Sequence, residues 1–543
     1  MAETFRFAPP YELPRWPFVA PPDLGAGERI RYPVVIAGGG LAGLVLACDL
    51  GQRGIQAVLL DDDDTVGVKG ASSRGICYAQ KSLELFDRLG IWPRIREKGV
   101  TWSVGRTMSG ADEVDRFDLA DTSRSEQPPF VNLQQFHLEW FLVDRILADG
   151  VADLRWSSRV LAVENREDHA VVEVETPAGR YALEAEWLVD ATGSNSPIRN
   201  AMGLDIHASK SVDRWCISDV RFAQPPAMER KTWVDAPFNE GRAVWQHLMA
   251  DDVWRLDYQM SPDADLESIS RPEVVGARLR EQLGPGVDFE FVWIGPYQYR
   301  DHLLESFRAG RTLFVGDAAH VVCPFGARGG NNGIQDSANL GWKLALVLAG
   351  EAGEALVDSY DHERHAAAVE NLKVAARTAR FLAPRTAEEH RVRRAVVDLA
   401  RHHAFARKHI DTGRMAVAND YPPSALCPTG ARSVQNIAFD GTALVRVLAE
   451  GGGTRLLGLV VARDPAGALA ALAPLAARHP IRLHAIEPGG PLVAHLEAAE
   501  GAFVLVRPDA YVAATLADAL DAAAVERAVR AALALDGSDT GDA

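Results

Sequence analysis

Residues 33–44 read PVVIAGGGLAGL, and a second apolar run over residues 57–60 ends at an aspartate. The apolar residues 34–37 predict a short buried strand, and the glycines after it predict a tight turn. Apolar side chains then recur at helical spacing over residues 41–53. The order strand, turn, helix, strand is that of the dinucleotide-binding half of a doubly wound α/β sheet.

Three glycines in this stretch have separate expected roles. Gly38 permits the tight turn, Gly40 lets the backbone approach a pyrophosphate, and Gly43 lets the helix pack closely on the strand. Asp61 stands 23 residues after Gly38, where a carboxylate can accept a hydrogen bond from an adenosine ribose. A glycine turn without any ligand is the simpler alternative, but the complete unit favours a bound nucleotide. Further residues expected to contact the nucleotide are Leu41, Ala42 and Asp62.

A second segment, far along the chain, is also an apolar run that ends in a polar turn. Residues 311–320 read RTLFVGDAAH, and Asp317 at the turn can hold a sugar-like hydroxyl. Pro324 and nearby glycines then predict a rigid loop whose backbone can lie against a flat ring. This segment can therefore hold both a sugar-like chain and a planar group.

The glycine- and asparagine-rich stretch after this loop predicts the start of a helix near residue 333. Gly330, Asn331 and Asn332 would point backbone N–H groups at whatever lies before the helix, which favours negative charge there. A reduced flavin carries negative charge at its N1 and C2 carbonyl edge, so such N–H groups would stabilise it. Alternatively, either asparagine is a plain N-cap, and both interpretations can hold together. The two segments together predict a flavin dinucleotide held at both ends.

Length and composition limit the class of protein. A chain of 543 residues is too long for one ordinary core, so two or three domains are expected. The net charge of -17 argues against a general nucleic-acid binder, which needs Lys and Arg on phosphates. The five scattered cysteines, without a CxxC pair, indicate neither a disulfide framework nor a metal site, and they favour a cytoplasmic protein. Neither a signal peptide nor a membrane-spanning segment is expected.

Shifts in composition predict five regions. Prolines dominate an N-terminal arm, aromatic residues mark a substrate region, and a proline-containing linker precedes a final unit of alternating strands and helices. The predicted bounds are 1–32 for the arm, 33–204 for the first part of the flavin-binding domain, 205–300 for a substrate-binding mixed sheet, 301–420 for the second part of the flavin-binding domain with long helices, and 430–543 for the C-terminal unit.

Further motifs make a family resemblance specific. Residues 73–76 read SRGI, Gln135 stands four residues before Glu139, residues 360–364 read YDHER, and residues 507–511 read RPDAY. Together with both glycine-containing segments, these motifs resemble those of single-component flavoprotein aromatic hydroxylases of the para-hydroxybenzoate hydroxylase type. In particular, the chain is similar to the 3-(3-hydroxyphenyl)propionate hydroxylase-like branch, which has a C-terminal thioredoxin-like domain.

The resemblance implies a fold, a cofactor and a reaction. The fold is α/β, with a Rossmann-type, glutathione-reductase-like FAD-binding domain, an inserted mixed-sheet substrate domain and a C-terminal thioredoxin-like domain. FAD is the implied cofactor, with Arg74 against its adenosine-diphosphate part and Gln135 on the phosphate side. NADH or NADPH is the implied transient co-substrate, used with O2 and a small aromatic substrate. A phenolic or related aromatic acid would be hydroxylated through a flavin C4a-hydroperoxide.

One stretch departs from the family pattern. Residues 189–199 read VDATGSNSPIR, in which Ser196 and Arg199 stand at the family positions. Thr192 stands where the family has an acid, and Asp190 lies two residues earlier. The same stretch resembles the Asp-Ala-Thr-Gly segment of flavin halogenases and geranylgeranyl-reductase-like proteins. A flavin-dependent reductase or dehydrogenase, and a flavin-binding protein without turnover, are therefore the alternatives.

The sequence does not identify a catalytic base. His247, Tyr258 and Arg242 lie on expected strands facing the expected substrate pocket, where each could bind or deprotonate substrate. An ordinary structural role in the sheet is the simpler interpretation of each. The C-terminal unit has no cysteine after Cys427, which excludes a thiol redox role there. Structural packing or the formation of a homodimer is its expected use.

Overall fold

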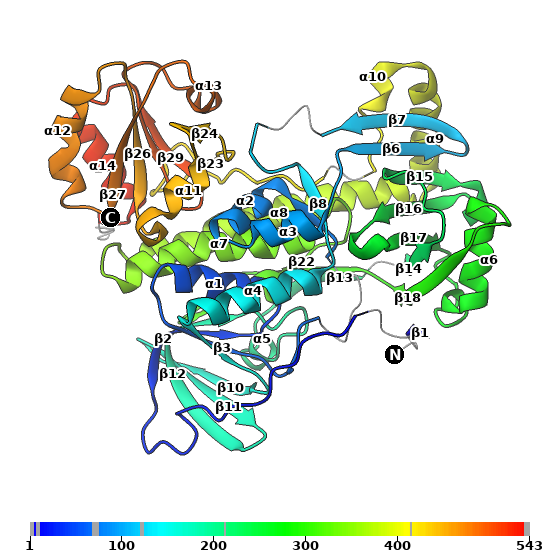
Figure 1. Cartoon of the computed structure of the whole chain (residues 1–543), viewed down its shortest axis with the longest axis horizontal. Helices are drawn as coiled ribbons and strands as arrows, with labels where there is room; N and C mark the ends of the chain where they lie inside the picture. Colours follow the sequence, from blue (N-terminus) through cyan, green and yellow to red (C-terminus); the bar gives the residue numbers. More distant parts are fainter. Residues whose placement is uncertain are drawn as a thin grey trace.

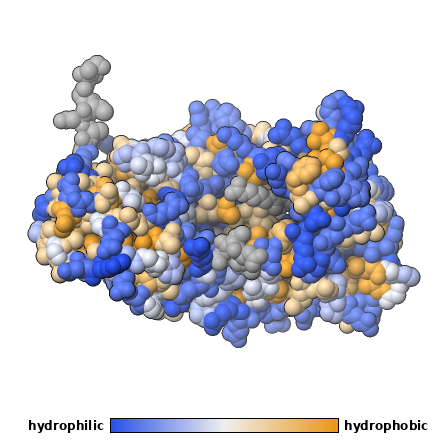
Figure 2. All heavy atoms as spheres, turned by 90° about the horizontal axis from the view of Figure 1, so that it is seen from above, coloured by the Kyte–Doolittle hydropathy of each residue, from blue (hydrophilic) through white to orange (hydrophobic). Residues whose placement is uncertain are grey.

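The computed structural model describes residues 5–6, 11–67, 75–119, 124–210, 213–412 and 415–536. Two long helices run through the middle of the molecule and lie between three β-containing units (Figure 1). Seen from above, the surface is hollowed between the C-terminal unit and the second sheet, and hydrophobic residues line part of this hollow (Figure 2). In the part of the chain that is described, every helix is too short or too polar to cross a bilayer.

The first sheet contains the strand that starts the glycine-rich stretch. Its strands are β2 (Arg31–Ala37), β3 (Ala57–Leu60), β9 (Ala152–Arg155), β10 (Arg159–Asn165), β11 (Ala170–Thr176), β12 (Gly179–Asp190), β20 (Arg308–Ala309) and β21 (Thr312–Phe314). β9, β3, β2 and β12 are parallel neighbours. Along its other edge, β12 pairs first with antiparallel β11 and then with parallel β21. The strand of the second segment thus enters the same sheet as the first.

Helices cover one face of this sheet, as the buried apolar runs of β2 and β3 require. The short and medium helices of this unit are α1 (Leu41–Gln52), α2 (Gln80–Arg88), α3 (Trp92–Lys98), α4 (Gln135–Asp149) and α5 (Pro197–Ala201). α1 packs against α4 and against the long central helix α7 (Arg328–Leu348). The helix expected over residues 41–53 is therefore present, with its end shifted by one residue.

The second sheet collects strands from distant parts of the chain. They are β1 (Phe5–Arg6), β6 (Val104–Ser109), β7 (Asp112–Asp118), β14 (Arg214–Phe222), β15 (Arg230–Ala236), β16 (Arg242–Leu248), β17 (Trp254–Met260) and β18 (Phe289–Tyr297). Their order is β1-β18-β14-β17-β16-β15-β6-β7. β6 and β7 precede the region in which the aromatic content predicts a sheet. Helix α6 (Pro272–Leu283) packs on the outer face of this sheet.

Long helices join the two sheets. After α7 come α8 (Ala355–Leu382), α9 (Ala387–His402) and α10 (Ala404–Arg407). α8 packs along α7, and residues of α8 and α9 share a hydrophobic cluster with the inner face of the second sheet. α7 and α8 therefore set the position of one sheet relative to the other.

The C-terminal unit has its own sheet. Its strands and helices are β23 (Arg432–Ser433), α11 (Leu444–Ala449), β26 (Leu456–Val461), α12 (Ala466–Ala476), β27 (Ile481–Ile486), α13 (Pro491–Leu496), β28 (Phe503–Val506), β29 (Tyr511–Leu516) and α14 (Ala522–Ala532). The strand order is β23-β29-β28-β26-β27, in which β26 and β27 are parallel and the other neighbours antiparallel. Strands and helices alternate from α11 as far as β28, which β29 follows directly without a helix between them.

Short elements connect these units. The strands are β4 (Cys77–Ala79), β5 (Val100–Thr101), β8 (Phe130–Asn132), β13 (Ile206–Lys210), β19 (Arg300–Leu304), β22 (His320–Val321), β24 (Ala438–Phe439) and β25 (Thr442–Ala443). The 3-10 turns are η2 (Pro237–Asn239), η3 (Ala250–Asp252), η4 (Ser268–Ser270), η5 (Gly316–Ala318) and η6 (Glu450–Gly453). Of these elements, β4 and η5 border the candidate site.

The N-terminal arm packs along the first unit. The ring of Trp16 stacks on that of Trp156 with centroids 4.7 Å apart, and its backbone N–H donates to the carbonyl oxygen of Asp64 at 2.8 Å. Further along, Asp23 is buried and pairs with Arg155 at 2.8 Å. The described part of the arm thus gains order mainly from contacts with the first unit, while β1 pairs with β18 of the second sheet.

Candidate active site

The glycines in the turn between β2 and α1 differ in how much space the surrounding protein leaves for a side chain. Gly38 has a φ of +107°, and a Cβ there would lie 2.5 Å from the carbonyl oxygen of Ala191. A Cβ on Gly43 would lie 2.0 Å from the carbonyl oxygen of Gly38. A Cβ on Gly40 would have no other described atom within 4 Å. Space is therefore left where a pyrophosphate has to approach the first turn of α1, which fits the expected role of Gly40.

Asp61 lies beside this turn. One carboxylate oxygen accepts the N–H of Gly39 at 2.5 Å, and the other accepts that of Asp63 at 2.8 Å. Burial raises the pKa of Asp61 to about 6, so a further hydroxyl donor would stabilise its ionised form. Asp62 is instead exposed, 3.7 Å from the exposed Arg159. Of the two predicted acids, only Asp61 lies at the glycine turn.

The two segments that predict a flavin are in direct contact. Gly316 of η5 has a φ of +58°, and a Cβ there would lie 3.1 Å from the Cβ of Ala42 on α1. A Cβ on Gly333 of α7 would lie 3.2 Å from the Cα of Gly316. At the start of both helices, a Cβ on Gly330 would lie 3.5 Å from the side chain of Leu41. Small residues thus bring the first turns of α1 and α7 side by side.

Helix α7 begins earlier than expected. Its first residue is Arg328 rather than a residue near 333, and Ala327, with a φ of +59°, is its N-cap. The carbonyl of the N-cap accepts the first hydrogen bond within a helix, from the residue four positions later, so in α7 the N–H groups without an acceptor in the helix belong to residues 327–330. Gly330 is therefore the last residue with such an N–H group, whereas Asn331 and Asn332 lie beyond it. Neither asparagine is the N-cap.

The side chains of the two asparagines have structural partners. Asn331 Oδ1 accepts the backbone N–H of Ala79 at 2.8 Å and the hydroxyl of Ser82 at 2.7 Å. Asn332 Oδ1 accepts a hydrogen bond from Arg364 of α8 at 2.6 Å. Any contact of Asn331 with a bound ring is therefore through its backbone, because its side chain joins α7 to β4 and α2.

Asp317 follows Gly316 in η5, and Pro324 lies in the loop that precedes α7. Both are exposed. His302 Nε2 donates to the carbonyl oxygen of Asp317 at 3.0 Å, and burial lowers the pKa of His302 to about 4, which keeps its ring neutral. The ring of Phe325, next to Pro324, packs on the indole of Trp245 with centroids 5.1 Å apart. The loop is thus held against the second sheet while its outer residues stay accessible.

Gln135 is positioned by a buried acid. Its Nε2 donates to Glu139 at 2.7 Å, and the N–H of Gly67 donates to the same carboxylate at 2.8 Å. Burial raises the pKa of Glu139 to about 7, while the backbone N–H of Leu41 is among the groups that stabilise its charge. Glu139 therefore lies at the start of α1, a position the sequence does not indicate. Arg74 lies outside the described residues.

The departure from the family motif has a local structural role. Asp190 accepts the N–H and the hydroxyl of Thr192 at 2.9 and 2.6 Å, and also the hydroxyl of Ser196. Arg199 donates to the carbonyl oxygen of Ala318 at 2.9 Å. Asp190 and Thr192 thus stabilise the turn after β12, and Arg199 connects this turn to η5.

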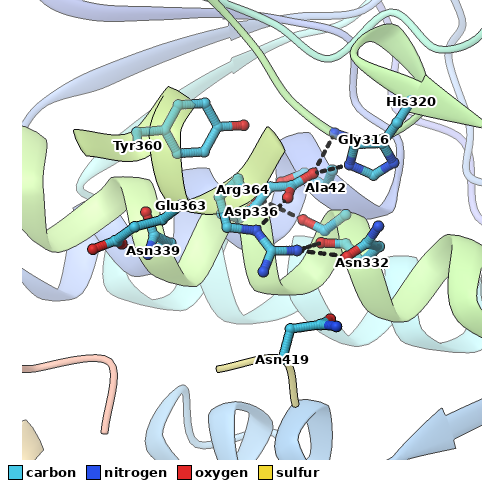
Figure 3. Close-up of polar contacts among 12 residues, drawn as sticks. Ala42, Gly316, His320, Asn332, Asp336, Asn339, Tyr360, Glu363, Arg364 and Asn419 are labelled. Carbon is cyan, nitrogen blue, oxygen red and sulfur yellow. Dashed lines mark hydrogen bonds and ion pairs between the residues drawn. The ribbon is translucent and has the colours of Figure 1, made fainter. Parts of the chain in front are cut away.

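Asp336 is a buried residue that sequence reasoning missed. Its Oδ2 accepts the backbone N–H of Gly316 at 2.9 Å and the ring Nε2–H of His320 at 2.7 Å, while its Oδ1 accepts the Nε–H of Arg364 at 2.7 Å (Figure 3). Arg364 also donates to Asn332. Although burial acts to raise it, the neighbouring His320 and Arg364 hold the pKa of Asp336 at about 2. The only sequence signal was the YDHER motif, whose arginine is Arg364.

Of the three candidate bases, only His247 lies on the inner face of the second sheet. Where β16 pairs with β17, His247 lies opposite Arg255, and Tyr258 lies opposite residue 244. Because residues 244 and 247 are an odd number of positions apart on β16, Tyr258 faces the other side of the sheet from His247. The hydroxyl of Tyr258 donates to Gln282 of α6 at 2.6 Å on the outer face. Arg242 faces the same side of the sheet as Tyr258, and its side chain forms an ion pair with Glu240. The expectation that Tyr258 and Arg242 face the pocket is therefore wrong, because side chains alternate along a strand.

The cysteines offer no reactive group here. All five are buried and unpaired. Burial raises the pKa of the Cys77 thiol to about 11 and that of Cys323 above its ordinary range, so both stay protonated. Among the described residues, no group of three His, Cys, Asp or Glu side chains is placed to hold a metal ion.

A parallel sheet with the first turns of two helices side by side, a free glycine approach and an acid after the second strand defines a protein that binds a flavin dinucleotide. A family model described as an FAD binding domain matches residues 31–375. The chain therefore belongs to this FAD-binding family, and FAD is its cofactor.

Two curated relatives agree with this family. The chain is 29% identical over 359 residues to the 3-(3-hydroxy-phenyl)propionate/3-hydroxycinnamic acid hydroxylase of Mycolicibacterium smegmatis, covering 65% of this chain and 61% of the relative. It thus spans less than two thirds of that relative. It is 30% identical over 352 residues to a flavin-dependent monooxygenase of Mycobacteroides abscessus, covering 61% of this chain and 70% of the relative.

Solved structures share the fold. Anhydrotetracycline hydroxylase from Streptomyces rimosus superposes with a TM-score of 0.71 at 25% identity, over 93% of this chain and 99% of the other. Aklavinone-11 hydroxylase, solved with FAD and aklavinone, superposes with a TM-score of 0.74 at 20% identity over the same shares. The family resemblance stated from the motifs is confirmed.

Two glycine substitutions separate cofactor binding from folding. Gly40→Ala should change the stability of the FAD-free protein by less than about 1 kcal/mol, because the loss of a favourable N-cap is offset by the lower entropy of the unfolded chain. Its affinity for FAD should fall by about tenfold or more, because the methyl group takes space near the pyrophosphate. Ultrafiltration of FAD with the apoprotein gives the affinity, and urea unfolding gives the stability.

Gly43→Ala is the matched variant. Its methyl group would meet the backbone of Gly38, so the FAD-free protein itself should lose roughly 1–3 kcal/mol of stability. Undiminished FAD binding by Gly40→Ala would contradict the placement of the pyrophosphate.

Proposed function

We propose that the protein is an FAD-dependent monooxygenase that hydroxylates a phenolic or related aromatic acid with NADH or NADPH and O2. The contact between the loop before α7 and the second sheet carries this proposal. Phe325 packs on Trp215 and Trp245, with ring centroids 6.2 and 5.1 Å away. An aromatic substrate on this face of the sheet would therefore lie beside a ring bound at the start of α7.

Each part of FAD has proposed protein contacts. FAD, when bound, supplies the ring that accepts a hydride and activates O2. Gly40 would let the backbone approach its pyrophosphate within the turn that Gly38 and Gly43 shape, Asp61 would hold its ribose and Asp317 its ribityl chain. The free N–H groups of the first turn of α7 would favour negative charge on the ring. Further proposed contacts are Leu41, Ala42, Arg74, Gln135, Pro324, Gly330 and Asn331.

Apolar residues next to the start of α7 would exclude water from the reaction. Cys77, Trp102, Phe130 and Met415 are buried in one cluster, against which Ala327 packs. Excluding water strengthens electrostatic interactions and protects reactive species. An apolar environment of this kind favours a protein that transfers oxygen over one that only transfers electrons.

The named relatives support the same reaction class. They include hydroxylases of hydroxyphenylpropionate and of anhydrotetracycline, which are phenol-containing aromatic substrates. Thr192, at the family's acid position, favours the alternatives of a flavin-dependent reductase or a flavin-binding protein without turnover. In those cases no oxygen would enter an aromatic ring.

Turnover separates the three possibilities. The FAD-loaded protein should oxidise NADH or NADPH faster when a panel of phenolic acids is supplied, with one hydroxylated product formed for each O2 consumed. Absorbance of the nicotinamide, an oxygen electrode and mass spectrometry of the products measure this. Peroxide as the sole product from every phenolic acid would favour a reductase, and flavin that neither nicotinamide reduces would indicate binding without turnover.

We also propose the domain division expected from the sequence, with a thioredoxin-like C-terminal domain. The order β29-β28-β26-β27, with α12, α13 and α14 between and after these strands, supports that assignment. Since the domain has no CxxC pair, its proposed role is packing against α7 and α8. Dimerisation stays a prediction that light scattering checks.

A further inference from the structure

The inner face of the second sheet concentrates buried polar atoms that lack partners. Arg230 Nε on β15, His247 Nδ1 on β16 and Asp257 Oδ1 on β17 have no hydrogen-bond partner among the described residues. The indole N–H groups of Trp215 and Trp245, on the same face, have none either. Buried polar groups are nearly always hydrogen-bonded, so this concentration indicates that the face binds a polar ligand.

Arg230 differs from Arg255 on this face in having no described carboxylate in direct contact. Arg255 is paired with Asp219 at 3.1 Å. Arg230 is only 8% exposed, and within the described ranges no carboxylate lies within 4 Å of its guanidinium. Its contacts are the sulfur of Met415 at 2.7 Å and the ring of Trp102 at 5.8 Å from the centroid. The charge of Asp257 acts on Arg230 from beyond ion-pair distance, and Asp257 also lies 3.9 Å from Arg255. A buried cation without a direct ion pair is costly, and a bound anion in contact with it would lower that cost.

His247 complements this cation. Burial, with Arg230 and Arg255 nearby, lowers the pKa of His247 well below its ordinary value. Its ring is therefore neutral at neutral pH, and a neutral ring next to two cations is a poor base but a good hydrogen-bonding group. An oxygen held by Arg230 could receive a hydrogen bond from it.

We infer that Arg230 binds an anionic oxygen of the aromatic substrate, with His247 as a hydrogen-bonding neighbour, and thereby selects anionic over neutral aromatic compounds. This inference rests on the proposed function for the aromatic part of the ligand. The oxygen belongs either to a carboxylate or to a ring phenolate. Arg230 is thus a specificity-determining residue rather than a catalytic base.

Binding to the oxidised, FAD-loaded protein tests this inference. The probes are 3-(3-hydroxyphenyl)propionate, its primary amide, and 4-nitrophenolate, and flavin absorbance gives each dissociation constant. Arg230→Met should weaken the preferred anion by about tenfold or more and hardly change the amide. Arg230→Lys, which keeps the charge, should retain most of the affinity. Loss for the acid alone assigns a carboxylate, and loss for nitrophenolate alone a phenolate.

Three outcomes would overturn the inference. They are equal weakening of acid and amide, unchanged anion binding by Arg230→Met, and failure of the wild-type protein to bind either anion. Because these measurements need no turnover, an inactive protein that still binds anions through Arg230 would refute the proposed function alone. Conversely, hydroxylation that is indifferent to Arg230→Met would refute this inference alone.

Thermal unfolding without any probe gives an independent readout. If Arg230 is retained for a ligand, Arg230→Met should leave the Tm unchanged or raise it, since a buried unpaired charge is removed. Arg255→Met is the matched variant, and it should lower the Tm by several degrees because Asp219 loses its partner. A fall in Tm for Arg230→Met as large as that for Arg255→Met would show that Arg230 serves the fold instead.

Discussion

Asp336→Asn should lower the free energy of unfolding by about 3–5 kcal/mol, because it leaves Arg364 fully buried without its carboxylate partner. The neutral amide also cannot accept N–H groups from Gly316, His320 and Arg364 as strongly as the carboxylate does. All of these partners are buried, so water cannot replace the lost interactions.

The same substitution should also weaken FAD binding. Asp336 fixes Gly316 relative to α7, and Gly316 precedes Asp317 in η5. A shift of η5 would therefore move both the expected ribityl contact and the first turns of α1 and α7. Urea unfolding measures the stability, and the ratio of flavin to protein absorbance after gel filtration measures retained FAD.

Asp398→Asn is the control for Asp336→Asn. Asp398 pairs with Arg401 at 2.6 Å, but its side chain is 70% exposed. Loss of such a surface pair should cost less than about 1 kcal/mol and should leave FAD content unchanged. A similarly small loss for Asp336→Asn would falsify the view that this carboxylate holds the site together.

Glu363→Gln should have a comparable effect on the C-terminal unit. Glu363 of α8 accepts two hydrogen bonds from Arg507, at 2.6 and 2.9 Å, and one from Lys343 at 2.8 Å. Burial opposes its ionisation, yet Arg507 and Lys343 hold the pKa of Glu363 far below its ordinary range. Without this charge, the buried cations lose a shared anion, at a cost of about 3–5 kcal/mol.

The position of this charged cluster determines which part of the protein should loosen when Glu363 is neutralised. Arg507 belongs to the RPDAY motif of the C-terminal unit, whereas Lys343 and Glu363 lie on α7 and α8. Glu363→Gln should therefore loosen the C-terminal unit from the central helices. Denaturant unfolding followed by both tryptophan fluorescence and limited proteolysis in the linker near residues 422–428 measures this.

The control for Glu363→Gln lies on the same helix. Glu370 is exposed on α8, so Glu370→Gln should leave both the unfolding curve and the cleavage rate unchanged. If the two variants behave alike, the buried cluster does not hold the C-terminal unit in place.

Local sequence patterns account for much of the nucleotide-binding unit. The strand over residues 57–60 and the helix from residue 41 were predicted because their apolar runs are bounded by glycine and by acids. The roles of Gly38 and Gly43 were predictable for the same reason, because each role depends on neighbours within the strand-turn-helix unit or its sheet. The mutual contact of the two distant segments was also predictable, because both carry parts of one cofactor site.

Other features depend on partners that are remote in sequence. The start of α7 at Arg328 was missed because glycines at residues 329 and 330 disfavour a helix locally, whereas packing against α1 favours it. Tyr258 and Arg242 were misplaced because the register of β16 and β17, set by neighbouring strands, decides which face they occupy.

The sequence by itself determined the class of cofactor, the glycine turn and the acid at Asp61, since these depend on short-range spacing and backbone sterics. Only the tertiary structure decided that Asp336 joins η5 to α8, that Arg507 joins the C-terminal unit to the central helices, and that Arg230 is left without a direct ion pair to any described residue. The physical reason is that burial and charge pairing are properties of three-dimensional surroundings. A charged residue carries no sign in its own stretch of sequence of whether water or a distant partner will surround it.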